Sequence, residues 1–344
     1  MDKEIRKKTG RLRLVWIPLL IVIPLLAAFV CLLIGRNSVS PRETIDILWK
    51  GIAGKIEKPT TASVTILSVR LPRILTAMLV GAGLSVAGCA FQSLFANPLA
   101  TPDTVGVAGG ASFGAALGLL FGLSQPYVQA LAFGMGLLAT ILTFGLGKTG
   151  RRKNEMNAVV LSGIMIGSLF SALVSFVKFS ADSETKLPEI TYFLMGSFKS
   201  ASYRSLLIGA IPIVIGILLL FLLRFRMNLL TFSEDEVRSF GVNMKRLRTA
   251  VLILSTMITA SCVALSGQVG WIGLLIPHMC RMAFKNNHLS LIPTCVSFGA
   301  VFVVLVDTVA RSISASEIPI SVFTAVIGAP FFIYLMKKTG GWSL

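Results

Sequence analysis

Long apolar runs separated by short polar segments recur along almost the whole chain. A helix needs about 20 apolar residues to cross the hydrocarbon layer of a bilayer, and ten runs approach that length. They predict ten membrane-spanning helices, at residues 15–35, 71–95, 104–122, 127–147, 157–179, 203–223, 249–267, 269–284, 290–312 and 319–336. The pattern therefore predicts an all-α membrane protein, and we expect the whole chain, 1–344, to form a single transmembrane domain.

The stretch from 249 to 284 has the least regular pattern. Gly267, Gly270, Gly273 and Pro277 interrupt its apolar residues. A broken helix at membrane depth is tolerated where neighbouring protein or a water-filled cavity satisfies the freed backbone groups. We therefore expect either two spans here or one span followed by a broken or re-entrant segment.

Composition and charge support a membrane protein. Hydrophobic residues make up 54% of the chain and charged residues 14%, against roughly a quarter charged in an ordinary soluble domain. The net charge of +17 comes from basic clusters between the apolar runs, which favours a membrane protein over a nucleic-acid binder. Most of these clusters lie on one side when both termini are placed in the cytoplasm. The first run is longer than a signal-peptide core and no small-residue cleavage site follows it, so we expect a retained span.

Patterns that indicate enzymatic chemistry are missing from the sequence. The five cysteines lie in or at the ends of apolar runs without a C-x-x-C spacing, and the two histidines belong to no metal-binding motif. We expect no disulfide, no metal site and no cofactor. The string from Gly145 to Thr149 resembles the end of a P-loop, but Leu142 occupies the position of its required first glycine. The chain is therefore predicted not to hydrolyse ATP itself.

Charged residues within membrane spans are expensive and are candidates for function. Asp307 lies in the ninth span with Arg311 four residues later on the same face, so these two can pair locally, with Arg311 near the outer surface. Asp307 lies near the span end and can also snorkel outward. Arg70 and Arg73 open the second span, and both side chains are expected to point into the outer aqueous layer. They are either interfacial anchors or a docking site for an acidic partner. The spans contain no ladder of central carboxylates or lysines, such as proton-coupled carriers often have. This absence weakens the interpretation as a secondary transporter without excluding it.

The first outer loop contains a helix signal. Ser40-Pro41-Arg42-Glu43 has the form of a capping box with proline at the first helical position. Ile45, Leu48 and Trp49 follow as an apolar stripe. These residues predict a short interfacial helix.

The loop 224–248 is the most distinctive cytoplasmic segment. Ser233 can cap a helix whose acidic first turn, Glu234 to Glu236, complements the positive end of the helix dipole. Gly241 can end this helix, and a second short helix can begin near Asn243. A helix–glycine–helix unit with exposed Leu and Phe side chains is typical of a docking surface for a soluble subunit.

A series of strings, in order from about residue 65 to 337, resembles the iron-siderophore, haem and cobalamin permease family of type II ABC importers. The strings are Arg70-Leu-Pro-Arg73, Gly81-Ala-Gly83, Gln92 with Asn97-Pro-Leu-Ala-Thr-Pro102, Gly106-Val-Ala-Gly-Gly-Ala111, Leu194-Met-Gly-Ser-Phe198, the loop 233–242, Gly270-Trp-Ile-Gly-Leu274 with Pro277-His278 and Arg281, Asp307 with Arg311, Glu317-Ile-Pro-Ile320 and Gly328-Ala-Pro-Phe331. Together they are highly specific.

The resemblance implies a ten-span subunit in a bacterial cell membrane. Its partners would be a second permease copy, identical or different, a pair of cytoplasmic ATPase subunits and an external substrate-binding protein. The implied substrate is a ferric siderophore, an iron chelate; haem or cobalamin carried by the same machine, or a stand-alone secondary transporter, are the alternatives. Membrane lipid surrounds the protein, and no nucleic acid partner is expected.

The resemblance also implies roles for particular residues. Docking of the binding protein is assigned to Arg70, Arg73 and Arg311. Coupling to the ATPase is assigned to Ser233, Glu234, Asp235, Glu236, Arg238 and Gly241. The translocation pathway, beside the fifth and tenth spans, is assigned to Ser162, Gly163, Gly167, Ser171 and Phe176. His278 is expected to be a packing residue.

Overall fold

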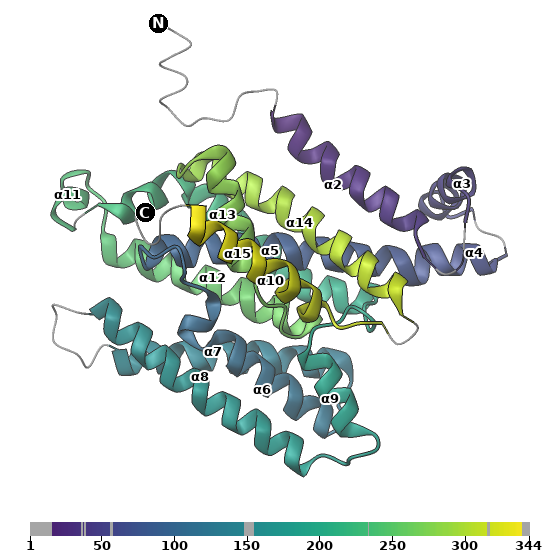
Figure 1. The fold of residues 1–344 in the computed structure, drawn as a ribbon, viewed down its shortest axis with the longest axis horizontal. Coiled ribbons are helices and arrows are strands. Elements are labelled where there is room, and N and C mark those ends of the chain that lie inside the picture. Colours follow the sequence, from purple (N-terminus) through teal and green to yellow (C-terminus); the bar gives the residue numbers. More distant parts are fainter. Residues whose placement is uncertain are drawn as a thin grey trace, which may run out of the picture.

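The computed structural model describes residues 16–35, 37, 39–55, 58–147, 155–232, 234–314 and 317–338. In these ranges the chain is helical with short connections, and no strand is present (Figure 1). Seven of the described helices are long and apolar enough to cross a membrane, and three shorter apolar helices bring the number to ten. Each predicted span coincides with one of these helices, which confirms the predicted all-α membrane fold.

The ten apolar helices are α2 (Trp16–Leu33), α5 (Leu71–Leu94), α6 (Val107–Leu120), α7 (Gln125–Gly147), α8 (Glu155–Ser180), α10 (Tyr203–Met227), α12 (Met244–Ser266), α13 (Ile272–Phe284), α14 (His288–Ile313) and α15 (Ile320–Lys338). The shorter elements are α3 (Pro41–Ile52), α4 (Thr61–Val64), the π-helical turn η1 (Thr65–Arg70), the 3₁₀ turns η2 (Pro102–Val105) and η4 (Asn228–Thr231), α9 (Lys186–Leu194) and α11 (Glu234–Ser239). The predicted outer-loop helix is confirmed as α3, which begins after Ser40, whose side chain accepts a hydrogen bond from the Glu43 amide.

Helix α5 is the central helix of the bundle, and it packs against α10, α12, α13 and α14 (Figure 1). Glycines permit these close crossings. A Cβ at Gly81 would overlap the carbonyl oxygen of Gly299 in α14, and one at Gly88 would overlap the carbonyl of Gly273 in α13. Lipid tails are as apolar as the helix side chains, so no hydrophobic force draws membrane helices together. Close packing of their backbones drives their association instead.

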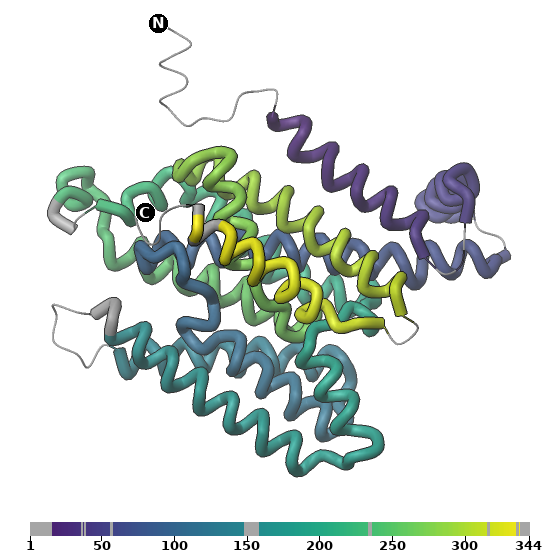
Figure 2. Tube along the Cα trace, viewed as in Figure 1, coloured from purple at the N-terminus to yellow at the C-terminus, as the bar shows by residue number. Residues whose placement is uncertain are grey.

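Helices α6, α7, α8 and α9 form a second group beside the first (Figure 2). Helix α6 packs on the other three, and α12 joins the two groups through contacts with α6 and α7. Gly110 and Gly114, which recur at helical spacing, lie against the carbonyl oxygens of Met135 and Leu131 in α7. This group positions α8 and the η2 turn, which line the cavity described below.

The irregular stretch 249–284 consists of a full-length helix, α12, followed by the 13-residue α13. Thirteen residues rise about 20 Å, less than the roughly 30 Å hydrocarbon layer, so α13 matches the alternative of a broken segment. The backbone turns through positive φ at Gly267 (70°) and Trp271 (69°). A non-glycine residue in this region is uncommon. Gly328 leaves space for the Trp271 side chain, because a Cβ at position 328 would press against the Trp271 indole.

Candidate functional site

A cavity of about 710 Å³ lies between the η2–α6 segment and α8. Of the residues predicted for a pathway, Gly163, Gly167 and Ser171 line it. They follow one another at intervals of four residues, so they share one face of α8. Ser162 and Phe176 are not among its lining residues: Ser162 is buried and Phe176 is 67% exposed on another face of the helix.

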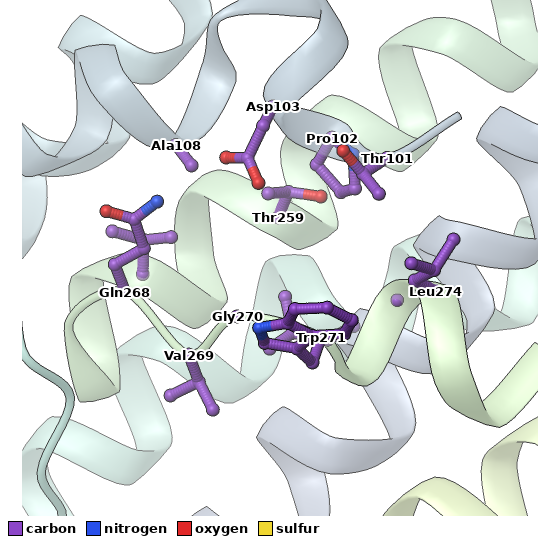
Figure 3. A pocket seen from close by; sticks show the side chains of 13 residues that line it. Thr101, Pro102, Asp103, Ala108, Thr259, Gln268, Val269, Gly270, Trp271 and Leu274 are labelled. Atoms are coloured by element: carbon purple, nitrogen blue, oxygen red, sulfur yellow. The ribbon is translucent and has the colours of Figure 1, made fainter. Parts of the chain in front are cut away.

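Two ionisable side chains, Asp103 and Lys178, line the cavity. Hydroxyl and amide groups line it as well, among them Ser112, Ser168 and Gln268. Asp103 and Gln268 also line a smaller adjoining pocket of about 40 Å³, next to Thr259 and Trp271 (Figure 3). Asp103 lies in the connection between α5 and α6. Its side chain is accessible from the cavity, but protein surrounds it closely enough that burial raises the pKa of its carboxyl.

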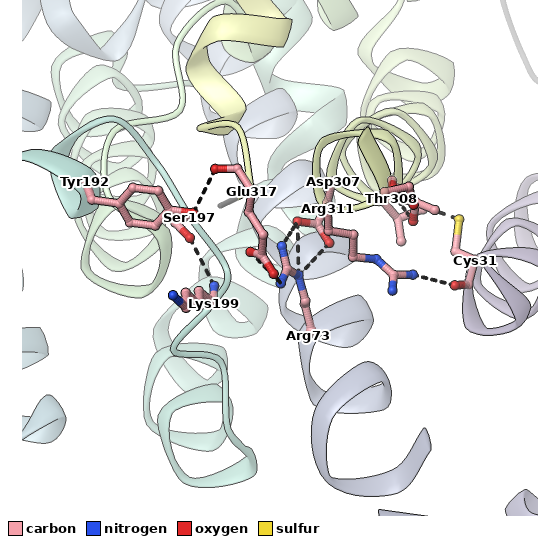
Figure 4. Close-up of polar contacts among 11 residues, drawn as sticks. Cys31, Arg73, Tyr192, Ser197, Lys199, Asp307, Thr308, Arg311 and Glu317 are labelled. Atoms are coloured by element: carbon pink, nitrogen blue, oxygen red, sulfur yellow. Dashed lines mark hydrogen bonds and ion pairs between the residues drawn. The ribbon is translucent and has the colours of Figure 1, made fainter. Parts of the chain in front are cut away.

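At the outer end of the bundle, Arg73 is held by two carboxylates (Figure 4). Its Nη2 lies 2.8 Å from Asp307 Oδ1 and its Nε lies 2.9 Å from Asp307 Oδ2. Its Nη1 donates to Glu317 Oε2 at 3.0 Å. The side chains of Arg73 and Asp307 are 10% and 0% exposed, so this is an interior ion pair that links α5 to α14.

The other two arginines bind the C-terminal carbonyls of α2. Arg70 Nη1 donates to the Leu32 carbonyl at 2.7 Å, and Arg311 Nη2 donates to the Cys31 carbonyl at 2.6 Å. The last carbonyls of a helix have no partner within the helix and sit at the negative end of its dipole, so cations are favoured there.

These placements correct two predictions. Arg70 and Arg73 do not point into the outer aqueous layer; both are buried. The physical reason is that α4 and η1 extend α5 upstream to Thr61, so the two arginines lie well inside a continuous helix between α2 and α14. Asp307 does not pair with Arg311, because Arg73 occupies its carboxylate. The docking role assigned to these arginines stays a prediction.

The predicted cytoplasmic helix is present as α11, and Gly241 follows it with a positive φ of 71°. The prediction of a second short helix was wrong, because the residues from Met244 onward form the first turns of the long helix α12. Asn243 caps α12 by accepting a hydrogen bond from the Arg246 amide. Of the coupling residues, Glu236, Arg238 and Gly241 are exposed. Ser233 and the side chains of Glu234 and Asp235 lie outside the described residues.

A polar network at the cytoplasmic ends of three helices was not predicted. His288, at the start of α14, lies with Nε2 2.5 Å from Ser93 Oγ in α5 and with Nδ1 2.8 Å from Asn228 Oδ1 at the end of α10. The His288 amide also donates to Asn228 Oδ1 at 2.9 Å. The only sequence signal was a histidine beside a polar turn, which does not identify partners 60 and 195 residues away.

His278 is half-buried, with its ring centroid 6.0 Å from that of Phe332, as a packing residue would be. Among the described residues, no group of three or more His, Cys, Asp or Glu side chains is arranged to hold a metal ion.

Residues 20–338 match the model of the FecCD transport family. The chain is 42% identical over 320 residues to the molybdate import permease MolB of Haemophilus influenzae, covering 92% of this chain and 94% of the relative. It is 35% identical to a probable iron chelatin permease of Helicobacter pylori (91% and 95% covered) and 33% identical to the vitamin B12 import permease BtuC of Escherichia coli (94% and 95% covered).

Solved structures agree with this relationship. A metal-chelate type ABC transporter in an inward-facing conformation superposes with a TM-score of 0.82 and 38% identity, covering 93% of this chain and 97% of that chain. PsaBC from Streptococcus pneumoniae, solved in complex with a Fab, shares the fold at 17% identity and a TM-score of 0.55. The ten apolar helices, the matched family model and these relatives lead to one conclusion: the chain belongs to the FecCD transport family and is a multi-pass permease subunit of an ABC importer in the bacterial inner membrane.

Proposed function

We propose that this permease imports a ferric siderophore, and that the α8 cavity is its half of the translocation pathway. The observation that carries the proposal is the cavity itself. Its volume of about 710 Å³ falls in the range of sites for ligands of several hundred daltons. Its lining combines glycine, hydroxyl and amide groups with apolar side chains such as Ile164 and Met195. Such a mixed lining suits a chelate that brings its own metal ligands, so the protein need not supply any.

Molybdate is a second candidate, because the relative with 42% identity is a molybdate import permease. The cavity volume favours the larger chelate over a compact oxyanion. Haem and cobalamin remain alternatives for the same machine, and the vitamin B12 permease is less similar, at 33% identity. Membership of an ABC importer family removes the stand-alone secondary transporter from consideration.

The proposed assembly pairs this chain with a second permease copy, two cytoplasmic ATPase subunits and an external binding protein. We assign the ATPase contact to α11 and its flanking turns. Val237 anchors this helix in the interior, while Phe232 and Phe240, 46% and 64% exposed, lie on either side of it. Aromatic side chains and arginine are enriched in protein contact surfaces, and Phe232, Phe240 and the exposed Arg238 supply both here. ATP-driven closure would then shift the cavity between outward and inward access through the differential stability of the two states.

The binding protein is proposed to dock on the outer face shaped by Arg70, Arg73 and Arg311. Because these side chains already hold internal partners, direct contact with an acidic residue of the binding protein would require Arg73 to exchange Asp307 or Glu317 for the new carboxylate.

Uptake into proteoliposomes tests the proposal. The chain, its ATPase and its binding protein would be reconstituted, and ATP-dependent uptake of a radiolabelled ferric siderophore, molybdate and cobalamin compared. Gly167→Leu is the probing variant, because a Cβ at Gly167 meets only the Gly106 Cα at 3.8 Å and the new side chain would enter the cavity. Gly134→Leu is the control, since a Cβ there has no neighbour within 4 Å.

We expect chelate uptake that Gly167→Leu abolishes and Gly134→Leu leaves intact. Uptake of molybdate alone would replace the siderophore assignment with the second candidate. Full uptake by Gly167→Leu would remove the α8 cavity from the pathway.

The ATPase contact has a separate test by affinity co-purification. Glu236→Lys with Arg238→Glu should release the ATPase from the detergent-solubilised complex. Lys186→Glu, on the outer helix α9, serves as a charge-changing control that should retain it. Retention of the ATPase by the double variant would place the contact elsewhere.

A further inference from the structure

Helix α3 carries apolar side chains that the protein does not cover. Its inner face, with Thr44 and Ile47, is buried. Ile45, Trp49 and Ile52 are 56%, 72% and 85% exposed. They recur at intervals of four and three residues, so they form one stripe along the helix.

The exposed stripe is contiguous with the buried face. At about 100° per residue, Ile47, Leu48, Ile52, Ile45 and Trp49 follow one another around a single apolar arc. Arg42, Glu43, Asp46 and Lys50 occupy the remaining arc, where Lys50 Nζ lies 2.6 Å from Asp46 Oδ2. The helix thus has three sectors in order: one against protein, one apolar and uncovered, and one charged. A helix between protein, lipid and water needs this order.

Contacts place α3 at the depth of the outer membrane interface. Tyr203 is the first residue of the spanning helix α10, and its hydroxyl donates to the Leu67 carbonyl at 2.6 Å. The side chain of Leu67 packs directly beneath α3, since a Cβ at Gly51 would lie 3.0 Å from Leu67 Cδ1. Helix α3 is therefore level with the outer end of a span, where Trp and Tyr side chains concentrate in membrane proteins.

The orientation of α3 fits the same location. Figure 2 shows α3 end-on beside the outer end of α2, whereas α2 and α5 run along the page. A helix that crosses the direction of the spans lies along the membrane plane. Helix α3 packs against η1, the turn leading into α5, and Val69 of that turn is exposed as well.

We propose that α3 is a membrane-surface anchor whose Ile45, Trp49 and Ile52 insert into the outer leaflet, with Arg42 and Lys50 at the level of the lipid phosphates. The occupant of this surface is lipid rather than the binding protein. Helix α3 packs against η1, which ends at Arg70 of the proposed docking face, but its three exposed apolar side chains supply far less area than the roughly 800 Å² per partner of a stable protein interface.

Fluorescence of Trp49 tests this placement. Replacing Trp16, Trp271 and Trp342 with Phe leaves Trp49 as the only tryptophan. The variant would be reconstituted in vesicles of phosphatidylcholine and phosphatidylglycerol, with and without lipids that carry a bromine or nitroxide quencher near the headgroup. In the matched control, Trp49→Phe and Glu43→Trp move the fluorophore to the charged arc of the same helix.

We expect quencher lipids to lower Trp49 emission about twofold or more, with little quenching by aqueous iodide. The control at position 43 should show the reverse. Iodide quenching of Trp49 without lipid quenching would overturn the proposal. So would loss of lipid quenching on addition of the binding protein, because that would identify the stripe as a protein docking surface.

A second measurement covers the case in which the tryptophan-depleted chain does not fold. All five native cysteines are buried, so Trp49→Cys can be labelled selectively with a nitroxide. Greater collision of the label with oxygen than with a water-soluble nickel complex supports insertion, and the opposite ratio refutes it.

Discussion

Arg73 and Asp307 form a two-point ion pair in the interior of the bundle, although 234 residues separate them in the chain. Asp307 accepts through both carboxylate oxygens, and Glu317 binds the remaining Nη of the guanidinium. The pair joins the outer half of the central helix α5 to α14. Since both side chains are almost entirely removed from water, each charge depends on the other for its stabilisation.

Removing the carboxylate is expected to be costly. Asp307→Ala should destabilise the protein by about 3–5 kcal/mol, because it leaves the buried Arg73 charge with only Glu317. Thermal unfolding in detergent measures the change. Asp46→Ala is the matched control, since the Asp46–Lys50 pair is about half exposed and is worth about 0–1 kcal/mol. Equal effects of the two substitutions would contradict a structural role for the interior pair.

The crossing of α5 and α13 should not tolerate a methyl group. In Gly88→Ala the Cβ would overlap the Gly273 carbonyl, so the helices must separate, at a cost of about 1–3 kcal/mol. Gly134→Ala adds the same methyl group where no atom lies within 4 Å and should be neutral. A melting temperature in detergent distinguishes the two, and an unchanged value for Gly88→Ala would disprove this close approach.

The His288 network should hold the loop that follows α10 to the membrane helices. His288→Ala removes the ring that bridges Ser93 and Asn228, and each of these two lost hydrogen bonds is worth about 0.5–1.5 kcal/mol. We expect faster amide hydrogen exchange in residues 228–243 and more ATP hydrolysed per transported substrate. His278→Ala, which loses a half-buried ring contact, should change neither quantity. Unchanged exchange in His288→Ala would show that the network does not hold the loop.

Asp103 gives the folded protein a pH dependence. Burial raises the pKa of its carboxyl, so the ionised form is less favourable in the folded chain than in the unfolded one. The stabilising contribution is therefore present at acidic pH and is lost as pH rises above the ordinary aspartate value of about 3.9 and through the raised pKa. Asp103→Asn should be more stable than the native chain at neutral pH and should flatten this part of the profile. Lys178 lines the same cavity and provides the control. Lys178→Gln should leave the dependence of stability on pH unchanged.

Membrane spans could be predicted from sequence because their cause is local. A bilayer requires each span to be long, apolar and hydrogen-bonded within itself, and every predicted span became a helix. Caps are local as well, so the start of α3 after Ser40 and the turn at Gly241 followed from a few neighbouring residues. No local sequence pattern predicted the π-helical turn η1, which continues α5 upstream of Arg70. This turn packs against α3, a contact between separate segments that a local pattern does not reveal.

The sequence by itself determined the apolar spans, the family and the class of transporter. Which charges pair was decided only by the tertiary structure. Arg311 stands four residues from Asp307, the spacing that suggests a local pair, yet α5 brings Arg73 to that carboxylate and α2 brings its terminal carbonyls to Arg311. In a low-dielectric interior each charge takes the partner that desolvation and helix packing leave within reach, and that depends on how distant segments cross.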